Sequence, residues 1–432
     1  MVDRATDLNR RRVLKGAGLA GAATLAGCMG GGSSQNEMAD SITAWGWDVA
    51  AKSLQITAKA YEKNNDATVN VKQIGRSDLK DKYKSKLLAG SGAPAVSMME
   101  SVDAAAWVDT GGLMDISGYL DESVKKKFVS GKWGPLEKDG KTYALPWDIG
   151  PVGTFYRKDV LDEHGVKIDS VETWEQFIEE GKKLPDDIAM LNIPSNDYDG
   201  LWRMQYRQLG GQPFTKDGKV AFNNDKSVRV ARNLKRLRDA GITASEASWS
   251  SSWFSAFKNG SIASLSAGAW MEGTLKAELP ETSGKWRVMR PPAFEKGGPR
   301  ATNWGGSNLV IADQVSDAKA NRGYDYMKHS LATKEMQIKM YQEYGIFPAF
   351  KPAYQSDAFD QGSEFLGGQP AGRLFANIAP NIPPYRYTTA TPEVTKAINT
   401  HFSDMMKGNV SPKKAVEKAA KQVADRTGRK LA

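Results

Sequence analysis

The feature that most constrains the fold of this chain is a regular alternation of strand-like and helix-like segments. Residues 41–47 (SITAWGW), 68–74 (TVNVKQI) and 95–99 (AVSMM) have the alternating or continuously apolar character of β-strands. Residues 49–65, between the first two, carry apolar side chains at helical spacing, and Ser77 is expected to cap a second helix. This order predicts a parallel sheet that is covered by helices.

The alternation starts again after a break at Gly150-Pro151. Before the break, Asp139-Gly140 indicates a hairpin turn. After it, residues 173–176 (Thr-Trp-Glu-Gln) form a capping box, which predicts a helix that begins there. A chain of 432 residues is long enough for two or three domains, so we expect two α/β lobes with the change of lobe near Gly150. In the second part we expect strands at 187–193, 261–270 and 303–312 and helices at 225–241, 392–407 and 411–426.

The N-terminus has the composition of an export signal. Arg10, Arg11 and Arg12 precede an apolar run at 16–27, which is followed by Cys28. A helical run of this length covers about 18 Å, less than the roughly 30 Å of a hydrocarbon core, so a secretory signal at 1–27 fits better than a membrane span. The arginines resemble the twin-arginine export motif, and the Leu-Ala-Gly-Cys that ends the run resembles a lipobox.

Cys28 is the only cysteine of the chain. A lone cysteine is ordinarily a small buried hydrophobe, but its position after the apolar run predicts a lipid-modified thiol instead. That modification leaves no thiol for a disulfide or a thiolate metal site. Residues 28–40 contain a run of Gly and Ser, so we expect a flexible tether between a membrane anchor and the folded part.

The net charge of +9 does not indicate a nucleic-acid-binding protein. The first 27 residues carry +3 of this charge. The other +6 is scattered over about 400 residues, as is typical of a solvated surface of mixed charge. We expect no nucleic-acid partner.

Motifs of the common catalytic sites are missing from the sequence. It has no G-x-S-x-G, no Walker loop, no H-E-x-x-H and no G-x-G-x-x-G after a strand. His164, His329 and His401 have no ligand-like spacing, so we expect neither a metal nor a cofactor. Ser77 and Lys80 fit S-x-x-K, but a helix cap explains this serine better. We therefore expect a protein that is not an enzyme, although a pair of carboxylates leaves a secreted glycosidase open.

Tryptophan is the residue type that stands out, with 12 in the chain. Several follow the ends of expected strands, which is the edge of an open α/β sheet where ligands bind. An indole face stacks on the apolar C–H face of a sugar ring, while nearby carboxylates bind its hydroxyls. A single tryptophan is more often a core residue, and for Trp147 and Asp148 a core ring and a turn carboxylate are the alternative. The group consists of Trp45, Trp47, Trp147, Trp270 and Trp304, with Asp48, Asp103, Asp148 and Glu272 nearby.

Six segments together resemble family 1 extracellular solute-binding proteins, which include maltose-binding-protein-like lipoproteins of ABC transporters. ALPWDIGPVGTFYRKDVLDEHGV is similar to the segment where the chain of those proteins first crosses between lobes, and NWGGSNLVI is similar to the second crossing. The matching segments cover most of the chain in the expected order. They are residues 144–166, 173–184, 257–270, 303–311, 343–350 and 410–423.

The resemblance implies a two-lobe α/β fold, each lobe a mainly parallel sheet flanked by helices, with a hinged cleft between the lobes. We expect lobe 1 to comprise 41–148 and 304–348, and lobe 2 to comprise 149–303 and 349–432. Such a monomer captures a sugar or oligosaccharide and delivers it to the permease of an ABC importer, outside the cytoplasm. Gly150-Pro151 is then a hinge at the floor of the cleft.

For the site, we expect Trp147, Trp270 and Trp304 to provide stacking faces and Asp48, Asp103 and Asp148 to accept hydrogen bonds from hydroxyls. Trp47, Glu100 and Tyr344 occupy loop positions similar to these, so we include them among the candidate binding residues. Aromatic cages also hold cations, so a polyamine or a peptide remains an alternative ligand.

Overall fold

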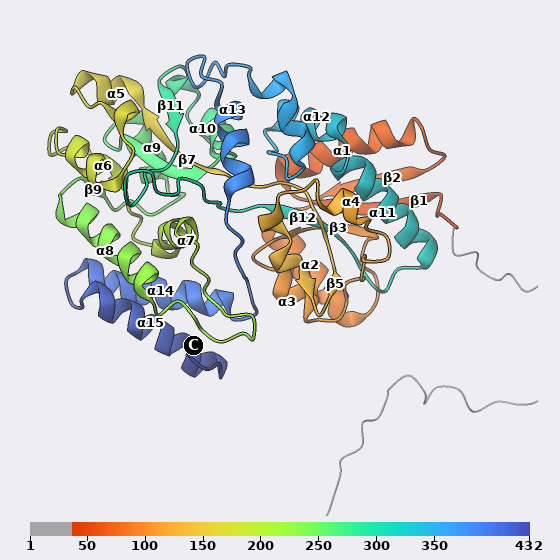
Figure 1. Cartoon of the computed structure of the whole chain (residues 1–432). Helices are drawn as coiled ribbons and strands as arrows, with labels where there is room; N and C mark the ends of the chain where they lie inside the picture. Colours follow the sequence, from red (N-terminus) through yellow and green to blue (C-terminus); the bar gives the residue numbers. More distant parts are fainter. Residues whose placement is uncertain (1–36) are drawn as a thin grey trace, which may run out of the picture. The chain divides into compact units, whose positions relative to one another are not determined.

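The computed structural model describes residues 37–432 (Figure 1). Cys28, the signal segment 1–27 and the tether up to residue 36 lie outside the described residues. No helix in the described part is both long and apolar enough to cross a membrane.

The first lobe is built on a five-stranded sheet with the order β2-β1-β3-β12-β6. β1 pairs in parallel with β2 and β3, as the alternation predicts, whereas β12 runs antiparallel to β3 and β6. The chain therefore returns to this sheet after it has built most of the second lobe. The strands are β1 (Ser41–Gly46), β2 (Thr68–Gln73), β3 (Val96–Glu100), β6 (Leu145–Pro146) and β12 (Ser307–Ile311).

Helices pack on this sheet and close one hydrophobic core. Leu54 and Tyr61 of α1 and Tyr326 of α11 are buried in it, and the Tyr61 and Tyr326 rings meet edge to face at 5.7 Å. Helix α1 contacts both α11 and α12. These helices are α1 (Asp48–Glu62), α2 (Arg76–Ala89), α3 (Ala104–Val108), α4 (Glu122–Lys125), α11 (Asp317–Leu331) and α12 (Lys334–Tyr344); β4 (Glu137–Lys138) and β5 (Lys141–Thr142) form a hairpin.

The central sheet of the second lobe corrects the expectation of a mainly parallel sheet. β10 and β11 both run antiparallel to β7. The reason is the path of the chain: β7 starts at the crossing, and β10 runs back to it, with Gly268 opposite Val152. A short parallel pair, β8 with β9, lies in the same lobe. These strands are β7 (Val152–Arg157), β8 (Leu191–Asn192), β9 (Thr243–Ala244), β10 (Ser264–Gly268) and β11 (Trp286–Met289).

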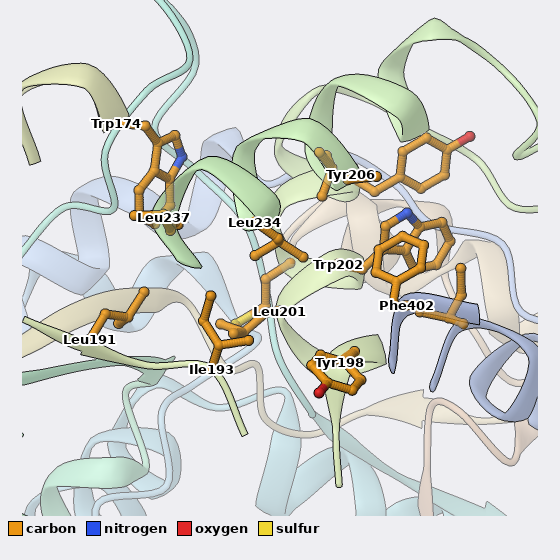
Figure 2. Packing of buried hydrophobic residues seen from close by; sticks show 14 of the residues in the cluster. Trp174, Leu191, Ile193, Tyr198, Leu201, Trp202, Tyr206, Leu234, Leu237 and Phe402 are labelled. Atoms are coloured by element: carbon orange, nitrogen blue, oxygen red, sulfur yellow. The ribbon is translucent and has the colours of Figure 1, made fainter. Parts of the chain in front are cut away.

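The helical part of this lobe has its own aromatic core (Figure 2). Trp202 stacks on Tyr206 at 4.8 Å, and its indole N–H donates to Ser227 Oγ at 2.9 Å, so the one polar atom of the ring is satisfied. α15 packs against α14 and α8. The helices are α5 (Lys158–Glu163), α6 (Trp174–Gly181), α7 (Tyr198–Gln208), α8 (Asp225–Asp239), α9 (Ser251–Asn259), α10 (Met271–Glu278), α13 (Ala371–Ile378), α14 (Thr391–Met406) and α15 (Pro412–Thr427).

Three segments run side by side where the chain passes between the two lobes. The Ile149 N–H donates to the Phe347 carbonyl at 3.0 Å, and the Trp304 N–H donates to the Gly150 carbonyl at 2.9 Å. A Cβ at Gly150 would lie 2.0 Å from the Trp304 carbonyl oxygen, so only glycine fits here. The sequence break at this glycine thus reflects a close backbone contact. The exact lobe boundaries stay a prediction.

Two of three local sequence signals are confirmed. Thr173 and Gln176 form the predicted capping box at the start of α6, and Asp139 and Gly140 have the positive φ angles of a hairpin turn. Ser77 is not a cap, because α2 begins one residue earlier with Gly75 at its N-cap. A serine inside the first turn of this helix makes no capping contact.

Paired alanine substitutions test this difference between the two helix starts. Thr173→Ala should lower the free energy of unfolding by about 1 kcal/mol, because the Gln176 N–H loses its acceptor. Ser77→Ala should leave it unchanged or raise it slightly, since alanine is the better helix former. Urea unfolding followed by circular dichroism measures both. An equal loss in the two variants would contradict the assignment of the caps.

Candidate functional site

A cleft of about 1070 Å³ is lined by both lobes and by the crossing segments. This exceeds the upper end of the roughly 300–1,000 Å³ typical of small-molecule sites. Seven of the nine predicted binding residues line it. They are Trp47, Asp48, Glu100, Asp148, Trp270, Trp304 and Tyr344.

An indole cluster forms one wall of the cleft. Trp270 lies against Trp304 edge to face at 5.6 Å, and its N–H donates to the Trp304 carbonyl at 3.1 Å. On its other side, Trp249 lies nearly parallel to it at 6.0 Å and 21°. Gly268 makes room for this arrangement, because a Cβ there would lie 2.4 Å from the Trp270 ring nitrogen. The cluster is therefore held by the backbone at the crossing.

Trp249 was not predicted as a site residue. It is 51% exposed and stands just before Ser250, the N-cap of α9. Site tryptophans were predicted from their position after expected strands. Trp249 follows no expected strand, so it was not included. The one sequence feature that could have indicated Trp249 is its position directly before the helix cap Ser250.

Glu100 is the carboxylate at the end of β3. It accepts from Arg76 at 2.5 Å and from Lys80 at 2.8 Å. Burial opposes its ionisation, but the charges of these two cations keep the pKa of Glu100 below its usual value. A carboxylate held ionised in this way is a strong hydrogen-bond acceptor at the cleft wall.

Asp148 lies at the floor, where its Oδ1 accepts from the Ser307 N–H at 2.5 Å. Burial raises the pKa of Asp148, and the charge of Lys132 opposes that shift. Lys132 is itself buried, which lowers its pKa to about 8, and it donates to Ser101 Oγ at 2.9 Å and to the Ser307 carbonyl at 3.0 Å. The sequence did not indicate this buried cation, which comes from a short 3-10 turn before Asp148 in the chain.

Two more carboxylates line the opposite sides of the cleft. Asp48 is exposed and has φ of +45°, a conformation that costs energy for any residue except glycine. Glu272 accepts from Ser363 Oγ at 2.5 Å and pairs with Lys276 at 2.8 Å. The sequence indicated Glu272 only as a neighbour of a tryptophan, and it gave no sign of Ser363.

The structure corrects two predicted site residues. Trp147 has no exposed surface and belongs to the core of the first lobe, so it offers no stacking face. Neighbouring residues of an extended chain point to opposite sides, and because Asp148 faces the cleft, Trp147 faces the core. Asp103 does not line the cleft and pairs with Lys80 at 2.8 Å. It lies at the start of α3, three residues past the strand end.

Across residues 37–432 no group of three or more histidine, cysteine, aspartate or glutamate side chains is placed to hold a metal ion. The cleft lining presents aromatic faces, carboxylates, two basic side chains and hydroxyl and amide groups.

A family model described as bacterial extracellular solute-binding protein matches residues 57–366. The chain belongs to this family. Its members are extracytoplasmic binding proteins and not enzymes. The resemblance read from the six sequence segments is thereby confirmed.

Individual relatives cover most of the chain. It is 26% identical to the lactose-binding protein of Rhizobium radiobacter over 86% of this chain and 89% of that protein. It is 22% identical to an arabinooligosaccharide-binding protein of Halalkalibacterium halodurans over 89% of this chain and 85% of that protein. The fold matches the ABC transporter associated binding protein from B. animalis subsp. lactis in complex with beta-1,6-galactobiose, with a TM-score of 0.73, 28% identity and coverage of 91% and 99% of the two chains. The predicted two-lobe α/β fold is confirmed.

The two tryptophan environments predict different losses of stability. Trp147→Ala should lower the free energy of unfolding by about 3–5 kcal/mol, because it leaves a large cavity in the core. Trp249→Ala should cost about 1 kcal/mol or less, since half of that ring is already in water. Urea unfolding by circular dichroism avoids the change in indole fluorescence. A Trp147→Ala variant as stable as the parent would overturn the core assignment.

Proposed function

We propose that this protein is the solute-binding component of an ABC importer and that it captures a sugar, best an oligosaccharide, in the cleft. The observation that carries the proposal is a cleft lined by the indole wall of Trp249, Trp270 and Trp304 together with several carboxylates. Indole faces suit the apolar faces of sugar rings, and charged acceptors bind hydroxyls more strongly than neutral ones do.

The size of the cleft supports a ligand of more than one ring. Its volume of about 1070 Å³ is more than a single small ligand fills. The relatives support the same conclusion, since they bind lactose, arabinooligosaccharides and beta-1,6-galactobiose. Capture without hydrolysis fits a family of binding proteins, and this argues against the secreted glycosidase.

A cationic solute, such as a polyamine or a basic peptide, is the second candidate. The cleft lining has seven carboxylates and only two basic side chains, Arg76 and Lys276. Exposed indoles also attract cations. The carboxylates are Asp48, Glu100, Asp148, Glu272, Glu278, Glu343 and Glu364.

Calorimetry with a panel of mono- and oligosaccharides, spermidine and a lysine-rich peptide tests the proposal. Glu272→Gln should weaken sugar binding about 10- to 100-fold, because the hydroxyl loses a charged acceptor. Glu175→Gln is the matched control, since Glu175 pairs with Arg236 on the surface and does not line the cleft, and it should bind as the parent does. Binding of spermidine or the peptide without any sugar would favour the second candidate, and release of shorter sugars from a bound oligosaccharide would favour the glycosidase.

For the N-terminus we propose export by the twin-arginine route and a lipid anchor on Cys28, which holds the protein at the outer face of the cytoplasmic membrane beside its permease. The support is the Arg10-Arg11-Arg12 run and the small residues that precede the cysteine. A tether of the composition seen at 28–40 would let a monomeric binding protein reach the permease while it stays anchored.

Cys28→Ser tests the anchor. The variant should lose the lipid and move from the membrane fraction to the soluble extracytoplasmic fraction, because one substitution removes the acceptor thiol. Fractionation with immunoblotting and mass spectrometry of the N-terminal peptide measure it. Ser33→Ala, in the same tether, is the control and should stay on the membrane. A Cys28→Ser protein retained on the membrane would refute the lipid anchor.

A further inference from the structure

A second, smaller cavity of about 30 Å³ lies beside the cleft. Trp249 and Trp304 line both cavities. A substituent of a ligand bound in the cleft beside these rings can therefore enter the smaller cavity. A water molecule needs roughly 10–15 Å³ of such space, so this side pocket accepts a small substituent and excludes a sugar ring.

Most of the side pocket is apolar. Leu201, Trp253, Leu265 and Met271 are buried side chains of its wall. Against these side chains a methyl group is favoured over a hydroxyl, because an apolar surface does not replace the hydrogen bonds that a hydroxyl makes with water.

The buried amide of the side pocket belongs to Asn192, which is 5% exposed. Its Nδ2 donates to the Glu246 carbonyl at 3.0 Å, which fixes the orientation of the amide. Its Oδ1 has no hydrogen-bond partner within the described chain. Buried acceptors in folded proteins are nearly always satisfied, so this oxygen calls for a donor from outside the chain.

Asp197 is the carboxylate of the side pocket. Asp197 Oδ1 accepts from the Gly200 N–H at 3.0 Å at the start of α7. Asn192 Oδ1 and the Asp197 carboxylate are acceptors on this wall, while Ser248 and Ser266 add hydroxyls that can donate to a ligand carbonyl. A ligand group that satisfies Asn192 Oδ1 must bring a donor together with its apolar part.

Trp249 separates the cleft from the side pocket in a strained conformation. Its φ is +70°, which is rare for a bulky residue, and its ring lies flat against Trp270. Such strain persists where the surroundings hold a residue in place, and it gathers at ligand sites.

We propose that the side pocket is a subsite for the acetamido group of an N-acetylated sugar, with the methyl group among the apolar side chains and the amide N–H donating to Asn192 Oδ1. The inference rests on the proposed function of the cleft. An acetamido group places a methyl and an N–H donor two bonds apart. The apolar side chains of the pocket suit the methyl, and Asn192 Oδ1 suits the donor. A hydroxyl lacks the methyl, a 6-deoxy carbon lacks the donor, and a free amine lacks the methyl that the apolar side chains would cover.

Calorimetry on matched sugars tests the inference. N,N′-diacetylchitobiose is compared with cellobiose and chitobiose, which carry a hydroxyl and an amine at the same positions, and N-acetyllactosamine is compared with lactose. At least one acetylated sugar should bind about tenfold or more tightly than its partners, as one added hydrogen bond and one buried methyl predict. Acetylated sugars that bind no better than their partners, or an amine that binds equally well, overturn the subsite. Failure of every sugar in the panel overturns the proposed function as well.

Variants locate the preference. Asn192→Ala should abolish it by weakening the acetylated sugars alone, and Ser248→Leu should abolish it by filling the side pocket from a residue that is not buried. Asn233→Ala, which removes a buried amide bonded to Gln205 outside the cleft, is the control and should keep the preference. If Asn192→Ala does not fold, Ser248→Leu gives the result. A preference that survives both pocket variants overturns the assignment.

Discussion

The backbone contact between Gly150 and Trp304 is the constraint on which the rest of this structure depends. It brings the first and second crossing segments so close that no side chain fits at position 150. The Trp304 N–H then donates to Gly150, and the Trp304 carbonyl accepts from the Trp270 ring. One close approach therefore joins the two lobes and orients the aromatic wall of the cleft.

The floor of the cleft depends on the same region through alternation of side chains. Asp148 turns to the cleft and Trp147 to the core, and the pair is fixed because backbone N–H groups of both residues donate to Ser307. Beneath them Lys132 supplies a positive charge and donates to that same Ser307 carbonyl. A slip of one residue here would bury the carboxylate in the apolar core and expose the indole, so the register is strongly specified.

The parts of the fold that depend on short-range patterns were predictable from the sequence. The parallel strands β1, β2 and β3, the capping box of Thr173 and the tail helices were all read from periodicity and cap residues. The antiparallel central sheet of the second lobe was not, because strand direction there depends on where the chain must return. In the site, residues at strand ends such as Glu100 and Trp270 were found by position. Trp249, Lys132 and Ser363 come from loops and turns whose path only the folded chain defines.

Backbone strain in this protein is concentrated at the cleft. Among residues 37–432, the non-glycine residues with positive φ are Asp48, Asp139 and Trp249. Asp139 is in a hairpin turn that favours this conformation, while the other two line the cleft, one from each lobe. Each costs of order 1–3 kcal/mol, which only the packing around it can offset. Strained residues of this kind gather at ligand sites, so the conformations of Asp48 and Trp249 support the proposal that the cleft binds a solute.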